Sequence, residues 1–157
     1  MLRMTKLTDY GTVVLACLAR GSEHLHSAAQ VATETRLAQP TVSKLLKALT
    51  RAGLVLSERG SQGGYTLARS AEDISAADII DALEGPVAIT TCSAGDGQCE
   101  LEPVCQVGNA WQRINVGIRS ALREITLDDL RTDAQPLPSL NLKAELKPSA
   151  RSAPIAN

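Results

Sequence analysis

The chain has 157 residues, of which 44% are hydrophobic and 2% aromatic, so one domain with an aliphatic core and some appendages is expected. No apolar run approaches a membrane span, and the opening residues lack the apolar stretch of a secretory signal, which predicts a cytoplasmic protein with no membrane partner. The net charge of −1 divides unevenly, because residues 1–70 carry nine basic and four acidic side chains and the rest carry seven and thirteen. The basic front half indicates an anionic partner or is ordinary surface variation.

The first two predicted helices are short and amphipathic. The first ends at Gly21. Its apolar face comprises Tyr10, Val13, Val14, Cys17 and Leu18. Cys17 lies on that face, so we interpret it as a small buried hydrophobe. The second helix begins at Ser27, where Gln30 completes a capping box.

The third predicted helix has Pro40 at its first position and closes at Gly53. Its buried face would comprise Val42, Leu45, Leu46 and Leu49. A tight turn separates it from the second helix, and it carries Lys44, Lys47 and Arg51. Two helices in this arrangement, with basic residues on the second, are typical of a helix-turn-helix.

A β-hairpin is predicted directly after this pair of helices. Residues 54–59 and 65–67 are short β-prone runs on either side of a glycine-rich loop. A hairpin that follows a recognition helix is a wing, and Arg59 beside flexible glycines could enter a minor groove. A phosphate-binding loop is excluded, because the GxxxxGK[ST] pattern is absent and a strand follows the loop.

The second half of the chain is predicted to be helical at both ends of a cysteine-containing segment. Ser75 and Asp78 form another capping box, and that helix stops at Gly85. The longest helix follows residue 106 and contains Trp111. Its apolar positions are 107, 110, 111, 114, 118, 121, 122 and 125. This face needs a cover, either a symmetric partner or the chain's own domain. A short turn at Thr126 precedes a proline-rich tail that is predicted to be disordered.

Three of the four cysteines lie within fourteen residues, at Cys92, Cys99 and Cys105. Structural zinc sites usually have Cys-x-x-Cys pairs and four ligands, and here six and five residues separate the thiols. Spread thiolates on a glycine-containing loop favour an iron–sulfur cluster. A thiol redox switch, zinc binding and incidental cysteines stay open as alternatives.

Together these features resemble the IscR/NsrR-type family of iron–sulfur regulators. The resemblance covers about residues 1–130 and is carried by the wing, the three cysteines and Trp111. The start, with Leu2-Arg3 and Lys6 to Tyr10, is most similar to the branch that regulates the SUF cluster-assembly operon. The implied fold is mainly α-helical with a small β-hairpin wing, a winged helix-turn-helix followed by a long C-terminal dimerisation helix. The implied organisation is a DNA-binding domain at 1–85, a cysteine loop at 86–105, a dimerisation helix at 106–130 and a tail at 131–157.

The resemblance also implies site residues. The expected cluster ligands are Cys92, Cys99 and Cys105. Thr41, Ser43 and Lys44 would face the groove, Lys47 would meet phosphates and Arg59 would mark the wing. The histidine that IscR-type members use after the third cysteine is absent, and Val107 and Gly108 occupy that stretch. NsrR-like members use an acid contributed by the partner subunit, and Asp9 stands at that position, with Glu100, Glu102 and water as alternatives. A [2Fe-2S] cluster is favoured over [4Fe-4S].

The sequence therefore predicts a homodimeric repressor of SUF genes that binds palindromic operator DNA and responds to the state of its cluster. A cluster-free repressor that senses thiol oxidants or nitric oxide is one alternative. A cluster carrier or scaffold is another. An enzyme is not expected, because the chain offers no paired acid and base, no nucleophile motif and no phosphate loop.

Overall fold

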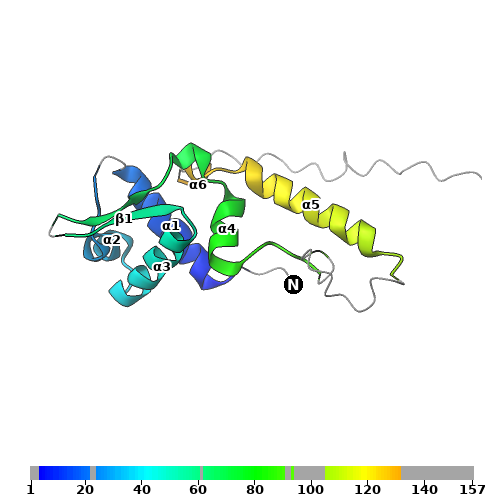
Figure 1. Ribbon diagram of the computed structural model, residues 1–157, viewed down its shortest axis with the longest axis horizontal. Helices are drawn as coiled ribbons and strands as arrows, with labels where there is room; N and C mark the ends of the chain where they lie inside the picture. The colour runs from blue at the N-terminus through cyan, green and yellow to red at the C-terminus, as the bar shows by residue number, and fades with distance from the viewer. Residues whose placement is uncertain (1–3, 22–23, 61, 91–92, 94–104, 132–157) are drawn as a thin grey trace, which may run out of the picture.

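The computed structural model describes residues 4–21, 24–60, 62–90, 93 and 105–131, and the predicted tail beyond Arg131 lies outside them. In Figure 1 most helices and the hairpin form one body, and α5 extends away from it. The described elements are α1 (Lys6–Arg20), α2 (Ala28–Thr35), α3 (Gln39–Arg51), β1 (Val55–Glu58), β2 (Gly64–Leu67), the 3-10 turn η1 (Ala71–Asp73), α4 (Ala76–Glu84), α5 (Gly108–Glu124) and α6 (Leu127–Arg131). This mainly helical architecture with an antiparallel β1–β2 hairpin confirms the predicted fold class.

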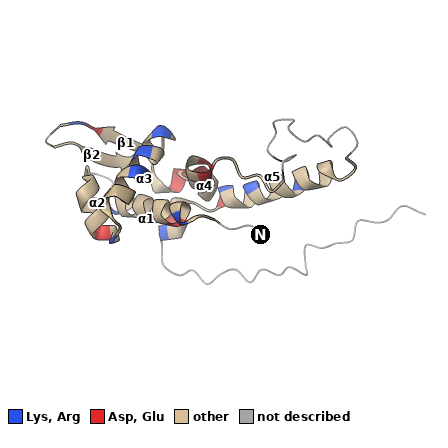
Figure 2. Cartoon of the chain, turned by 90° about the horizontal axis from the view of Figure 1, so that it is seen from below, with Lys and Arg blue, Asp and Glu red and all other residues tan. Residues whose placement is uncertain are grey.

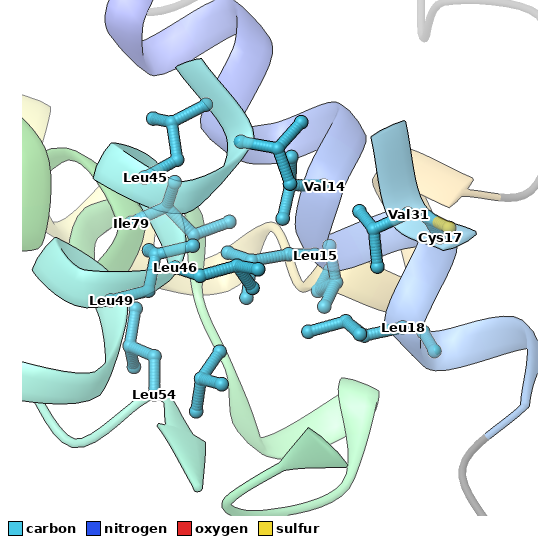
Figure 3. Close-up of a cluster of buried hydrophobic side chains, with 14 of the residues drawn as sticks. Val14, Leu15, Cys17, Leu18, Val31, Leu45, Leu46, Leu49, Leu54 and Ile79 are labelled. Carbon is cyan, nitrogen blue, oxygen red and sulfur yellow. The ribbon is translucent and has the colours of Figure 1, made fainter. Parts of the chain in front are cut away.

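The core of the body is aliphatic and is built around α1 and α3 (Figure 3). Its fully buried members from these two helices are Val14, Leu15, Leu18, Val42, Leu45, Leu46 and Leu49. The predicted buried face of α3 is therefore confirmed, and Cys17 is also buried as expected. Close packing of this kind holds the outer face of α3 in a fixed position.

The helix starts follow from local side-chain chemistry. The Ser27–Gln30 and Ser75–Asp78 capping boxes are both present, so two orphan backbone donors are satisfied at each start. Helix α3 begins at Gln39, one residue earlier than predicted. Pro40 fits there because the first turn of a helix needs no backbone N–H from it.

The chain returns to the core after α5. The extended backbone of Ile125 interrupts the predicted long helix, and its carbonyl accepts a hydrogen bond of 2.8 Å from the Ala76 N–H. The Leu127 N–H then donates to the Ile74 carbonyl at 2.7 Å, and the Leu127 side chain is fully buried. The C-terminal end of α5 is thus fixed to the body.

Candidate nucleic-acid interface and cysteine site

The outer face of α3 is polar and basic. Ser43, Lys44 and Lys47 are exposed, whereas Thr41 is half-buried at the start of the same helix. The structure thus places three of the four predicted DNA-contacting residues of α3 in solvent. The turn that sets α3 against α2 contains Arg36 in the left-handed conformation, with φ of 56°. Sequence reasoning predicted a tight turn here but not its left-handed residue, because glycine is the residue that normally signals a positive φ.

The wing lies beside α3 and is held to the body by its backbone. The Tyr65 N–H donates to the His26 carbonyl and the His26 N–H donates to the Tyr65 carbonyl, each at 2.9 Å. This bridge joins the segment before α2 to β2, and no side-chain pattern predicted it. Gly63 packs so tightly against the Glu58 carbonyl that a Cβ would collide with it. Arg59 is exposed and directly follows the last residue of β1, at the tip of the hairpin.

The basic residues of α3 and the wing are free to meet an external anion. Figure 2 shows blue segments on α3 and near the tip of the hairpin, on the same side of the body. The described part of the chain forms three ion pairs, and none of them uses a basic residue of α3 or the wing. Exposed, unpaired cations on a rigid helix and a neighbouring hairpin are the features that phosphate binding requires.

Of the predicted cluster ligands, the structure describes Cys105 and Asp9, while Cys92 and Cys99 lie outside the described residues. Cys105 is half-buried just before α5, and Asp9 is exposed in the first turn of α1. Among the described residues, no three His, Cys, Asp or Glu side chains come together as a metal site would require. The described ligand candidates of one chain are therefore not brought together.

Cys105 lies next to the start of α5. A Cβ added to Gly108, the first residue of α5, would lie 3.7 Å from the Cys105 Sγ, which is ordinary contact. A thiol is the donor that iron–sulfur clusters prefer. The chemistry and the partial exposure of Cys105 thus fit a cluster ligand.

Asp9 borders an apolar groove of about 490 Å³. Residues from α1, α4, α6 and the end of α5 line it, including Val13, Ile125 and Leu130, which are exposed. The N-terminal end of α5 extends away from this part of the molecule in Figures 1 and 2. The groove and the Cys105 end of α5 are therefore separate surfaces of one chain.

Glu84 fixes the position of the first turn of α1, and sequence reasoning did not find it. Its Oε1 accepts hydrogen bonds from the Thr5 N–H at 2.8 Å, from the Thr5 hydroxyl at 3.0 Å and from the Thr8 hydroxyl. These hydrogen bonds, the one from Thr8 first, hold the pKa of Glu84 below its ordinary value. The end of α4 is thereby tied to the turn that carries Asp9.

Cys17 is chemically distinct from the clustered cysteines. Burial, followed by the hydrogen bond to Glu34 and its charge, raises the pKa of Cys17 to about 12. Its Sγ donates to Glu34 Oε2 at 3.2 Å, a link between α1 and α2. Because the thiolate is the reactive form, this thiol is protected from oxidants and metals.

No helix among the described residues is both long and apolar enough to cross a membrane.

Comparison with known proteins shows that this chain is similar to transcriptional regulators. The family model Rrf2, described as an iron-dependent transcriptional regulator, matches residues 4–133. The chain is 33% identical over 138 residues to Protein rrf2 of Nitratidesulfovibrio vulgaris, which is 87% of this chain and 92% of that protein. It is 32% identical over 130 residues to Protein aau3 of Rhizobium meliloti, covering 82% and 84% of the two chains.

Solved structures lead to the same conclusion. CymR, the global cysteine regulator of B. subtilis, matches 86% of this chain and 100% of its own with a TM-score of 0.63 and 30% identity. IscR of T. potens matches 85% of this chain and 89% of its own with a TM-score of 0.62 and 32% identity. These matches confirm the resemblance to winged-helix regulators of the IscR/NsrR type.

Proposed function

Because the chain belongs to the Rrf2 family of transcriptional regulators, we propose that it is an iron–sulfur-dependent repressor of SUF cluster-assembly genes. Rrf2 regulators bind DNA and typically act as dimers. The observation that carries the proposal is the unpaired basic surface shared by α3 and the wing, with three further cysteines after it.

The proposed DNA contacts divide by chemistry. Thr41 and Ser43 have short hydroxyls at the start of α3, which suits hydrogen bonds to base edges in the major groove. Lys44 and Lys47 are long, exposed cations that suit phosphates. Arg59 at the wing suits a narrow minor groove, where negative potential attracts a guanidinium group. Sequence preference would therefore come from the hydroxyls and Arg59, and most of the affinity from the lysines.

The proposed homodimer uses the exposed apolar face of α5. Val107, Trp111 and Ile114 are 58%, 40% and 47% exposed, although all three belong to the predicted apolar stripe. A second copy of the chain would cover this stripe and favour a palindromic operator. Trp111→Glu should then shift the protein to monomers in sedimentation velocity and weaken binding to a palindromic site. Unchanged sedimentation would rule out this interface.

In the proposed site, Cys92, Cys99 and Cys105 hold the cluster, and Asp9 of the partner subunit supplies the fourth ligand. A [2Fe-2S] cluster is our first choice and [4Fe-4S] the second. The cluster would supply redox and ligand-exchange chemistry. A single carboxylate ligand among thiolate ligands would dissociate easily. The chain's own residues would orient that carboxylate, because Glu84 holds the first turn of α1 through Thr5 and Thr8.

The test measures both the cluster content of the protein and its affinity for DNA. Protein purified without oxygen should contain iron and sulfide, and its affinity for DNA upstream of the SUF genes should differ between loaded and cluster-free forms at one salt concentration. Equal affinities would refute cluster control. Loss of loading in Asp9→Ala, with retained loading in the neighbouring Tyr10→Phe, would support the fourth ligand.

The similarity to CymR favours a second candidate, a cluster-free repressor that responds through its thiols. In that case protein purified without oxygen would contain no iron, and its operator affinity would change with oxidant. Substitution of Cys105 by serine would abolish the response to oxidant and leave the affinity of the reduced protein unchanged.

A further inference from the structure

Asp81 joins three parts of the molecule. It lies on α4, and its carboxylate accepts two hydrogen bonds from the guanidinium group of Arg119 on α5. They run from Nη1 to Oδ1 at 3.2 Å and from Nη2 to Oδ2 at 2.7 Å. Its Oδ1 also accepts a hydrogen bond of 3.3 Å from the Val87 backbone N–H, at the start of the segment that leads to the cysteines. The two side chains are only 31% and 23% exposed. Asp81 therefore fixes α4, α5 and residue 87 relative to one another.

The far end of the same segment contacts α5 one turn earlier. Asn115 is 6% exposed, and its Nδ2 donates to the Ser93 carbonyl at 3.5 Å. Ser93 is also held in a turn, because its N–H donates to the Thr90 carbonyl at 2.9 Å and the two hydroxyl oxygens are 2.7 Å apart. Val87 is thus held to α4, and Ser93, which follows the proposed ligand Cys92 in the sequence, is held to α5.

Asn115 also has an unsatisfied atom. Its Oδ1 is buried and has no hydrogen-bond partner among the described residues. The Ser93 carbonyl accepts from Nδ2 of the Asn115 side chain, which fixes the orientation of that amide. Its Oδ1 is an acceptor and therefore needs a donor of its own. A buried acceptor without a partner costs free energy, which favours any rearrangement of the turn that brings a donor to it. The anchor at Ser93 is therefore the least satisfied part of this network.

We propose that Asp81, Arg119 and Asn115 are positioning residues that transmit a displacement of Ser93 or Val87, caused by cluster binding, to the DNA-binding body, an inference that rests on the proposed cluster-dependent function. A displacement of Ser93 would act on α5 through Asn115, and a displacement of Val87 would act on α4 through Asp81. The Asp81–Arg119 pair would make the two helices move together. Helix α4 packs on α1 and α3, so its position sets that of the recognition helix.

The other ion pairs of the described residues do not have this form. Arg69 and Asp78 meet through one contact of 3.4 Å with side chains 43% and 40% exposed. Exposed pairs of that kind contribute little to geometry or stability. The Asp81–Arg119 pair is bidentate, half-buried and 38 residues apart in the chain, and Figure 2 shows the acidic positions of α4 beside basic positions near the C-terminal end of α5.

The experiment compares operator affinity of the loaded and cluster-free full-length protein. In wild type the ratio of the two affinities should lie within the range of about 5- to 150-fold that allosteric coupling usually gives. Arg119→Gln should reduce it to less than about threefold, because the link between α4 and α5 is lost. Arg119→Lys, which keeps the charge without the bidentate geometry and preserves the fold, should give an intermediate ratio. Arg69→Gln is the matched control and should leave the ratio unchanged.

A wild-type ratio in both Arg119 variants would overturn the inference while the proposed function stands. If Arg119→Gln does not fold, the ratio in Arg119→Lys decides the outcome. A ratio of one in the wild-type protein would overturn the proposed function, and the inference with it.

A readout without DNA tests the anchor at Ser93. Asn115→Leu removes the hydrogen bond and the unsatisfied oxygen at similar volume, so the loaded protein should lose iron to a chelator faster than wild type. The same rate in wild type and Asn115→Leu would remove Asn115 from the network.

Discussion

Lys47 offers a quantitative test of the DNA-binding surface. It lies on the outer face of α3, is exposed, and takes part in none of the ion pairs formed by the described residues. A cation of this kind contributes to binding by neutralising a phosphate and releasing its counterion. Lys47→Gln should therefore change how binding depends on salt while leaving sequence preference intact.

The magnitude follows from the geometry of a dimer. If Lys44 and Lys47 each meet one phosphate per subunit, they contribute about four of the released counterions, and Lys47→Gln removes about two of them. The slope of log affinity against log salt then becomes less steep by about 1.8. Between about 50 and 200 mM salt, wild type should lose about tenfold more affinity than the variant.

Fluorescence anisotropy with a labelled operator and a scrambled duplex, across a salt series, measures both quantities. Lys47→Gln should weaken binding to the two duplexes equally, whereas Ser43→Ala should weaken operator binding alone. Arg69→Gln is the control, because Arg69 pairs with Asp78 on α4 and should leave the slope unchanged. A Lys47→Gln slope equal to that of wild type would refute the phosphate contact.

Three further predictions concern the body of the protein. Leu127→Ala should lower the free energy of unfolding in urea by about 2–5 kcal/mol, because Leu127 is fully buried, whereas Leu56→Ala, at a position 54% exposed, should change it by less than about 0.5 kcal/mol. Cys17, with its pKa raised to about 12, should resist iodoacetamide at neutral pH until urea unfolds the chain, as followed by mass spectrometry. Because the pKa of Glu84 is lowered from its ordinary value of 4.5, the ionised carboxylate stabilises the fold at pH values above 4.5, and this stabilisation is lost as the pH falls through the folded-state pKa. Glu84→Gln should therefore make the free energy of unfolding less dependent on pH in the acid range. An unchanged dependence on acid pH would contradict the assignment.

The parts of the fold that sequence could predict depend on short-range patterns. The buried positions of α3 repeat every three to four residues, and the capping boxes at Ser27 and Ser75 need only residues three apart. The hairpin follows from two β-prone runs around glycines. Each of these signals is complete within one element, so no knowledge of the tertiary fold is needed to recognise it.

The contacts that sequence could not predict join residues far apart. Asp81 and Arg119 are 38 residues apart, and Glu84 is 76 from Thr8. Charged residues at such separations pair in many combinations, and only the packing of α4 on α5 and α1 selects these two. The return of Leu127 to the core was missed for the same reason, since a short helix after a break at Ile125 looks like the end of a solvent-exposed segment.

The candidate site divides in the same way. The positions of Ser43, Lys44 and Lys47 follow from the burial of the opposite face of α3, so helical periodicity alone places them in solvent. The cysteine spacing indicates a set of thiol ligands but contains no information on which acid completes it, because that acid would come from another subunit. Assignment of Asp9 therefore depends on resemblance and remains a prediction.

The architecture also supports the proposed homodimer. Within the described part of one chain, the apolar face of α5 and the groove beside Asp9 are both uncovered. Helix α5 cannot fold back into the groove, because Arg119 is fixed to Asp81 and Leu127 is buried in the core just beyond its C-terminal end. Two unfilled apolar surfaces that one chain cannot bring together can be covered by a two-fold symmetric partner, in which each copy gives its helix and receives the other's. That exchange would also bring the Cys105 end of one subunit towards Asp9 of the partner subunit, so the proposed cluster site and the dimer would form together.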